Sequence, residues 1–462
     1  MLEDLASSVR DRRVSARELV ERSLERIDRL NPSIGAVIAV RDQAVDDAAA
    51  LEDRIARGED PGPLAGVPLL VKDMEDVEGM PSTYGSLLFQ DAPVAVADGL
   101  IPQRLKAAGA IVVGKTNQPE FAFAGYTDNR LYGPTRNPWN LEASPGGSSG
   151  GSGAAMAAGL APIATATDGG GSIRIPAAWC GLVGIKPTNG VIGRRPIPEW
   201  IDLSTFGPLG HSVDDVRLLL ELERGPVPGD PSALPEPLEL REELPARAFA
   251  VPRLVDFGPL APELQSLFED SVRDFEQGVG VSVEMLETGS VFRAGNVSDD
   301  WLVLCALEHV YHLGWEFCDA NYERFSPVFT GVVDFARKTP LDEYMAVRRR
   351  RFEYVRELDE LLGDDAVLLC PTNAVAWITA DGKNPETGDW GDSADAFNTD
   401  PQNMTNHPAI SVPAAVTEAG VPFGLEITAP RFRDGMAIAA ARAWERSNPW
   451  PITAPGYDPF SA

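Results

Sequence analysis

Gly146-Gly-Ser-Ser-Gly-Gly-Ser-Gly153 and Thr167-Asp-Gly-Gly-Gly-Ser-Ile-Arg174 are the two stretches that decide the fold of this chain. Between them, the alanine-rich residues 154–160 predict a helix and residues 163–167 predict a strand. Flexible glycine-serine linkers do not contain such elements. The segment 142–187 is therefore predicted to be a buried unit in which a helix and a strand separate two serine-bearing glycine loops.

Three other interpretations of these glycine loops fit less well. A phosphate-binding loop needs a lysine directly after its last glycine, and no lysine follows either loop. Gly146-x-Ser148-x-Gly150 matches the nucleophile elbow of α/β-hydrolases, but residues 137–145 before it do not form a strand pattern. That elbow also needs a histidine, and none of the histidines lies in a distinctive context: they are His211, His309, His312 and His407. A role in backbone packing alone explains two serine-bearing loops poorly.

Hydrophobic periodicity around this segment alternates between strands and helices, which is typical of an α/β fold. Ser15 to Glu18 forms a capping-box pattern, and the helix behind it is predicted to end at Asn31-Pro32. Strands are predicted at 38–40, 67–71, 111–113, 366–369, 407–412 and 423–428, and helices at 104–108, 264–275, 301–322 and 341–362. The proline- and glutamate-rich residues 226–245 indicate a surface loop or a subdomain boundary.

The segment from Gly146 to Thr188 closely resembles the signature of the amidase signature family. Both glycine loops match it, and so does the ending Cys180-Gly-Leu-Val-Gly-Ile-Lys-Pro-Thr188. Agreement over some forty residues is far more specific than a short motif. Further family-like blocks stand at 64–73, 133–138, 207–209 and 408–413. The resemblance covers residues 1–222 and about 365–462.

The resemblance implies an α/β fold, an α/β/α sandwich with a large mixed central sheet covered by helices. It implies a single amidase domain over residues 1–462, with a signature core at 1–222 and 365–462. Residues 223–364 are expected to form a variable, mostly helical insertion on the substrate side. No cofactor and no metal are expected.

Residue by residue, the resemblance implies a Ser-cisSer-Lys triad. Ser172 is the nucleophile, Ser148 is the serine that follows a cis peptide, and Lys72 is the base. The backbone amides of Gly169, Gly170, Gly171 and Ser172 form the oxyanion hole. The expected substrate-binding residues are Phe123, Gly125, Tyr126 and Gly147, and the residues expected to hold the loop in shape are Asp168 and Arg174.

These residue types suit acyl transfer. A serine hydroxyl needs a base, and lysine can act as one only if burial lowers its pKa. Asp73 follows Lys72, but neighbours on a strand point to opposite faces, so Asp73 need not neutralise it. Ser148 can donate and accept, so it can carry a proton between Ser172 and Lys72 and then to the leaving amine.

The composition limits the partners and the compartment. With 69 acidic and 40 basic residues, the net charge of −29 repels nucleic acid and anionic membranes. The four cysteines form no disulfide framework, and no signal peptide and no run of about 18 apolar residues is present. We expect a cytoplasmic protein with no nucleic-acid or membrane partner, and the sequence leaves a homodimer open. Zinc is a weaker alternative at Cys305, His309, His312 and Cys318, whose spacing fits an amphipathic core helix better.

The expected reaction is C–N bond hydrolysis through an acyl-enzyme on Ser172. Small neutral amides, anilides or carbamates (urethanes) are the expected substrates, as in an aryl-amidase or urethanase-like member. The alternative is the A-type subunit of a glutamine-dependent amidotransferase, which works with a partner. Gly169 stands where relatives carry a larger residue such as Thr, which indicates an altered pocket.

Overall fold

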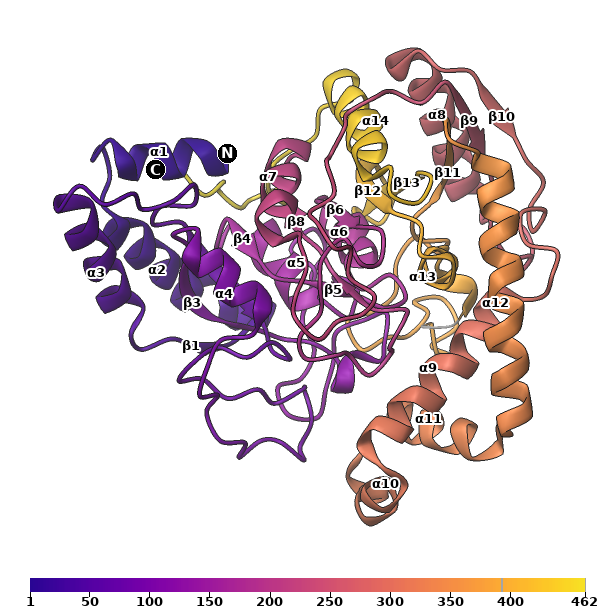
Figure 1. Ribbon diagram of the computed structural model, residues 1–462, viewed down its shortest axis with the longest axis horizontal. Helices are drawn as coiled ribbons and strands as arrows, with labels where there is room; N and C mark the ends of the chain where they lie inside the picture. The colour runs from indigo at the N-terminus through magenta and orange to yellow at the C-terminus, as the bar shows by residue number, and fades with distance from the viewer. Residues whose placement is uncertain (392–393, 462) are drawn as a thin grey trace.

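Two β-sheets organise the chain in the computed structural model, which describes residues 1–391 and 394–461 (Figure 1). The smaller sheet has four strands in the order β1-β3-β2-β4, and β3, β2 and β4 run parallel. Its strands are β1 (Val37–Val40), β2 (Pro68–Lys72), β3 (Ile111–Thr116) and β4 (Ile163–Ala164). Every residue of β2 and β3 is buried, which is typical of parallel strands covered on both faces.

The first helices of the chain surround this smaller sheet at the indigo end of Figure 1. They are α1 (Leu2–Arg10), α2 (Ala16–Ile34), α3 (Ala44–Ala56) and α4 (Leu100–Ala107). The predicted capping box is present, because the Ser15 hydroxyl accepts from the Glu18 amide and the Glu18 carboxylate accepts from the Ser15 amide. The predicted end at Asn31-Pro32 is two residues too early. Helix α2 continues to Ile34, where Gly35 ends it in the left-handed region at φ +67°.

The larger sheet has seven strands in the order β10-β9-β11-β13-β12-β6-β8. Strands β10, β9 and β11 run parallel, and each later neighbour is antiparallel, so this large sheet is mixed, as predicted. The strands are β6 (Val183–Lys186), β8 (Leu209–Gly210), β9 (Arg247–Ala250), β10 (Val283–Met285), β11 (Ala366–Pro371), β12 (Ala409–Val416) and β13 (Pro422–Thr428). A short pair, β5 (Thr167–Asp168) and β7 (Thr205–Phe206), lies beside it.

Helices cover both faces of the larger sheet. Gly424 and Glu426 of β13 face helix α6 (Arg174–Cys180), where Gly424 lies against Ala178 and Glu426 bonds Arg174. Alternate residues of a strand point to the opposite face, so Leu425 and Ile427 point toward the other helices that pack on β13. Those helices are α8 (Pro262–Val279) and α14 (Asp434–Ser447), while α5 (Gly150–Ala157) and α7 (Val213–Glu223) pack nearby.

A separate helical layer follows, drawn in orange in Figure 1. It contains α9 (Val297–Leu313), α10 (Trp315–Asn321), α11 (Pro327–Lys338), α12 (Leu341–Leu362) and the later helix α13 (Asp400–Thr405). The single helix predicted over 301–322 is wrong, because Gly314 at φ +88° divides it into α9 and α10. The segment 223–364, expected to be mostly helical, also contributes strands β9 and β10 to the larger sheet.

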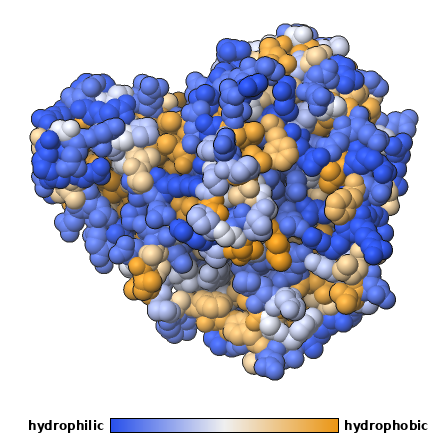
Figure 2. All heavy atoms as spheres, viewed as in Figure 1, coloured by the Kyte–Doolittle hydropathy of each residue, from blue (hydrophilic) through white to orange (hydrophobic). Residues whose placement is uncertain are grey.

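The surface is polar over most of the face seen in Figure 2, and apolar side chains gather near the centre of this face. Among the described residues, no helix has both the length and the apolar character needed to cross a bilayer. All four cysteines are buried free thiols.

Candidate active site

Lys72, the last residue of β2, ends in a buried group of hydroxyls. Its Nζ lies 2.7 Å from Ser148 Oγ, 3.0 Å from Ser149 Oγ and 2.8 Å from Thr167 Oγ1. The side chain is completely buried. The structure therefore brings Lys72 and Ser148 into direct contact and adds Ser149 and Thr167, which the sequence analysis did not assign to the site.

The charge state of Lys72 follows from this environment. Burial lowers the pKa of Lys72 to about 7, and the acids Glu75 and Asp168 oppose this only in part. Hydroxyl groups can donate to a neutral amine as well as accept from an ammonium. Near neutral pH a large share of Lys72 is consequently unprotonated and able to accept a proton.

Asp73 does point away from this group, as the strand alternation predicted. Its carboxylate accepts from the Thr83 amide and hydroxyl and from the Gly85 amide. It also lies 4.0 Å from Lys115 Nζ, on the other side of the sheet from Lys72. The acid that follows Lys72 in the sequence is thus held by a separate set of partners.

Ser148 and Ser172 lie on neighbouring loops. The Gly147–Ser148 peptide is cis, as the resemblance implied. Gly147 fits only without a side chain, because a Cβ there would come within 2.6 Å of the carbonyl oxygens of Ala124 and Tyr126. The Ser149 amide donates to the Ser172 carbonyl over 3.3 Å and links the two loops. Ser172 itself lines a cavity open to a ligand.

The three glycines before Ser172 allow large side chains to approach the loop backbone. A Cβ on Gly169 would come within 2.2 Å of Trp200, and one on Gly170 within 2.4 Å of Trp301. The loop carbonyls are also held from this side, because Trp301 Nε1 donates to Gly169 O over 2.8 Å and Thr399 Oγ1 donates to Gly170 O over 2.7 Å. The glycine at 169 thus makes room for Trp200.

The four amides expected to form an oxyanion hole differ in their partners. The Gly171 amide donates to Asp168 Oδ1 over 2.8 Å, so it is already occupied. Within the part of the chain that the structure describes, the amides of Gly170 and Ser172 have no hydrogen-bond acceptor. Both residues line the cavity, so their amides are the donors best placed for an oxyanion.

Asp168 and Arg174 hold the loop from beneath, in the positions expected for a structural role. Arg174 donates to both Asp168 oxygens at 2.9 and 3.0 Å, and to Glu426 at 2.9 Å, with all three side chains fully buried. Burial alone would raise the pKa of Asp168, but the Arg174 guanidinium outweighs it and holds that pKa at about 2. Asp168 therefore stays charged and fixes the loop through the amides of Gly171 and Ile173.

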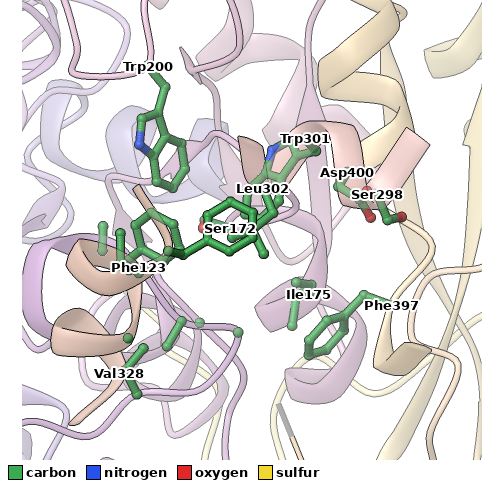
Figure 3. A pocket seen from close by; sticks show the side chains of 18 of the residues that line it. Phe123, Ser172, Ile175, Trp200, Ser298, Trp301, Leu302, Val328, Phe397 and Asp400 are labelled. Atoms are coloured by element: carbon green, nitrogen blue, oxygen red, sulfur yellow. The ribbon is translucent and has the colours of Figure 1, made fainter. Parts of the chain in front are cut away.

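The cavity above Ser172 has a volume of about 430 Å³ and is mainly apolar. Figure 3 shows Phe123, Trp200, Trp301 and Leu302 close around Ser172. Further apolar lining comes from Ile175, Val328, Val332, Phe335, Trp390 and Phe397. Its polar corner is formed by Ser298, Asp299 and Asp400, where burial raises the pKa of Asp400 to about 6.

The expected substrate-binding residues fall into two groups. Phe123, Gly125 and Gly147 line the cavity. Tyr126 does not line it, and instead packs edge-on against Trp390, which does. The tryptophans at 200, 301 and 390 were not predicted. The only signal for them was Gly169, whose missing side chain implies a bulky neighbour.

The alternative metal residues are not grouped around an ion site. His309 is buried among aromatic rings, with Phe329 at 5.1 Å between ring centroids, whereas His312 is half exposed. Among the described residues, no three His, Cys, Asp or Glu side chains are placed to hold one metal ion. Among the described residues that line the cavity there is no histidine, so an elbow-type serine-histidine pair has no support at Ser148 or Ser172.

Comparison with known proteins identifies the family. The model for the Amidase family matches residues 18–438. This chain belongs to the amidase signature family. It is 34% identical to an acylamidase of Rhodococcus erythropolis, covering 97% of this chain and 95% of that protein. The crystal structure of a bacterial aryl acylamidase of the amidase signature family superposes with a TM-score of 0.85 at 30% identity, covering 96% of this chain and 95% of that one.

A second group of amidase relatives has another described role. The A-type subunit of the glutamyl-tRNA(Gln) amidotransferase of Bdellovibrio bacteriovorus is 31% identical, covering 96% of both chains. The family and the fold class predicted from the motifs are confirmed, and the chain is an amidohydrolase.

Proposed function

We propose that this amidase hydrolyses small, neutral amides with an aryl group, through an acyl-enzyme on Ser172. The observation that carries the proposal is the hydroxyl-bound Lys72 next to Ser148, at the base of an aromatic cavity that contains Ser172. Aromatic rings favour edge-to-face and offset contacts with an aryl ligand. The likeness to an acylamidase and to an aryl acylamidase supports the same substrate class.

The proposed reaction follows from the proton relay. Neutral Lys72 takes the Ser148 proton while Ser148 takes the Ser172 proton, and Ser172 Oγ bonds to the carbonyl carbon. The amides of Gly170 and Ser172 bind the resulting oxyanion, each contributing on the order of 2.7–4 kcal/mol. Lys72 then returns the proton through Ser148 to the leaving nitrogen, and the C–N bond breaks. Water attacks the acyl-enzyme by the same relay and releases the carboxylic acid.

Carbamates remain within this proposal because their carbonyl carbon is attacked in the same way. An aryl carbamate would either carbamoylate Ser172 with loss of the alcohol or transfer its alkoxycarbonyl group to Ser172 with loss of the amine. Hydrolysis of either adduct would release the remaining alcohol or amine and carbon dioxide. The cavity of about 430 Å³ is large enough for a single aromatic ring with a short chain.

The second candidate function is glutamine hydrolysis for a partner protein. The specific observation in its favour is the 31% identity to the A-type chain of the amidotransferase named above. Glutamine is zwitterionic and needs charged groups to bind its amine and carboxylate. Asp299 and Asp400 could meet the amine, but the described lining contains no lysine or arginine to meet the carboxylate. The lining favours a neutral aryl substrate.

The test compares three substrates on the purified protein. We would measure kcat/KM for an anilide, for an aryl carbamate with the same ring, and for glutamine. Turnover of the aryl pair that is lost in Ser172→Ala supports the proposal, and their ratio ranks amide against carbamate. Glutamine turnover alone would contradict it.

A further inference from the structure

Glu75 is a buried acid close to Lys72 that the reaction above does not use. It follows the end of β2, and its amide donates to the Lys72 carbonyl over 2.9 Å. Its side chain is 6% exposed, and neither carboxyl oxygen makes a hydrogen bond of ordinary length. The Thr165 hydroxyl lies near enough to favour its charged form, but it also accepts from the Lys72 amide at 2.9 Å.

A second cavity of about 280 Å³ lies beside Glu75. It shares no lining residue with the substrate cavity. Thr167 lines this second cavity, and its hydroxyl contacts Lys72 Nζ at 2.8 Å. Lys72 also contacts Ser148, which directly follows Gly147 of the substrate cavity. Lys72 therefore has one hydrogen-bond partner toward each cavity.

The charges of Lys72 and Glu75 depend on each other. The hydrogen bonds of Lys72 Nζ go to hydroxyls, and among the described residues no ion pair joins it to Glu75. Two buried charges without direct contact are costly. Moving one proton from the Lys72 ammonium to the Glu75 carboxylate leaves an amine and a carboxylic acid, and removes both charges. Burial lowers the pKa of Lys72 and raises the pKa of Glu75, so the two pKa values lie much closer together than in water and one proton can be shared between the groups.

We propose that Glu75 is a positioning residue that shares one proton with Lys72 in the resting enzyme, and that the second cavity lets this proton exchange with solvent while substrate fills the first. The inference rests on the proposed role of Lys72 as the base. Asp168, the other acid that acts on Lys72, is already paired with Arg174. Lys115 and Glu223 interact electrostatically with Glu75. The other charged or titratable residues that line the second cavity with Glu75 are Asp76, Tyr84, Arg194, Arg195, Glu199 and His312.

The test uses phenylmethanesulfonyl fluoride, which reports the reactivity of Ser172 without a known substrate. The rate of Ser172 sulfonylation is measured from pH 5 to 10 in the wild type and in Glu75→Gln, with mass spectrometry to locate the adduct. Without the anionic neighbour that favours its ammonium, Lys72 loses its proton at lower pH. We expect the acidic limb of the profile to move down by on the order of one pH unit and to become narrower.

Glu199→Gln is the matched control, because it removes the same charge from the same cavity and Glu199 has no described interaction with Lys72. The acidic limb of the pH–rate profile of Glu199→Gln should match that of the wild type. A uniform fall in rate at every pH in Glu75→Gln, without a shift, would show a purely structural role and overturn the inference. The wild-type profile is a second test that does not need the variant to fold. If its acidic limb is described by the titration of a single group, the inference is overturned.

Failure of the proposed function gives a different result. If the reagent modifies other residues of the wild type and leaves Ser172 free, Ser172 is not the activated nucleophile. If Ser172 is modified and only the shift is missing, the proposed function stands and the role of Glu75 does not.

Discussion

The substrate cavity and the network beside it are built from opposite kinds of side chain. The hydroxyl side consists of Lys72, Ser148, Ser149 and Thr167, joined by hydrogen bonds of 2.7–3.0 Å around Lys72, together with Ser172, which lines the cavity. The aromatic side consists of Phe123, Trp200, Trp301, Phe335, Trp390 and Phe397. The two meet at the glycine loop 169–171, whose carbonyls accept from Trp301 and Thr399.

This difference separates the residues that carry out the reaction from the residues that select the substrate. A proton relay depends on positions within tenths of an ångström, so changes on the hydroxyl side should affect every substrate. Aromatic contacts are less directional and scale with buried surface, so changes on the aromatic side should affect substrates unequally. The following predictions either sharpen this division or break it.

The largest effect is expected on the hydroxyl side. Ser172→Ala and Lys72→Ala should each lower kcat/KM by about 10⁴-fold or more for every substrate, since each removes a member of one relay. Steady-state kinetics and thermal unfolding of both variants check this. Lys106→Ala, which breaks a surface ion pair with Asp98, is the control and should keep wild-type rates. Near-normal turnover in a folded Lys72→Ala protein would show that the hydroxyl side does not carry the reaction.

The next effect is expected where the two sides meet. Gly170→Ala places a Cβ within 2.4 Å of Trp301 and displaces an oxyanion donor. We expect kcat to fall by about 10²–10³-fold. Adding Trp301→Ala provides space for the new methyl group, so the double variant should recover part of kcat relative to Gly170→Ala. Equal or additive losses would show that the tryptophan does not position this loop.

The pH dependence tests the hydroxyl side alone. Lys72 must be neutral to accept a proton, and its folded pKa lies at about 7. Activity should therefore rise with pH through about 7, and well below that value kcat/KM should approach a tenfold fall per pH unit. The profile should be the same for an anilide and an aliphatic amide. Profiles that differ between the two would place the titrating group on the substrate-selecting side.

The smallest effect is expected on the aromatic side. Phe123 packs edge-on against Trp200, with ring centroids 5.1 Å apart, and both rings line the cavity. Phe123→Ala should lower the ratio of anilide to aliphatic amide kcat/KM by about tenfold, from a loss on the order of 1.5 kcal/mol in aromatic contact. Phe352→Ala, an exposed phenylalanine far along helix α12, is the matched control. An unchanged ratio would show that Phe123 does not select the substrate.

Most of the hydroxyl side could be predicted from the sequence, whereas most of the aromatic side could not. Local signals, such as the capping box at Ser15 and the apolar run before Lys72, depend on neighbouring residues and can be interpreted directly. The glycine loops gave the family and the expected roles of Ser148 and Ser172 through a long match, and the block 64–73 gave the expected role of Lys72.

The aromatic side could not be predicted because it depends on tertiary contacts. Trp200, Trp301 and Phe397 come from separate segments, and no local pattern brings them together over Ser172. Tyr126 was assigned to the cavity through the resemblance, but its ring packs edge-on against Trp390 and does not line the cavity. The occupied amide of Gly171 likewise follows from the buried carboxylate of Asp168.

The most direct test of the account is to trap the acyl-enzyme. An activated aryl ester or anilide is mixed rapidly with the protein and quenched in acid, and the labelled peptide is identified by mass spectrometry. The account predicts one acyl group on Ser172 in the wild type and none at this position in Lys72→Ala. An acyl group on another residue, or full turnover with Ser172 never modified, would contradict it.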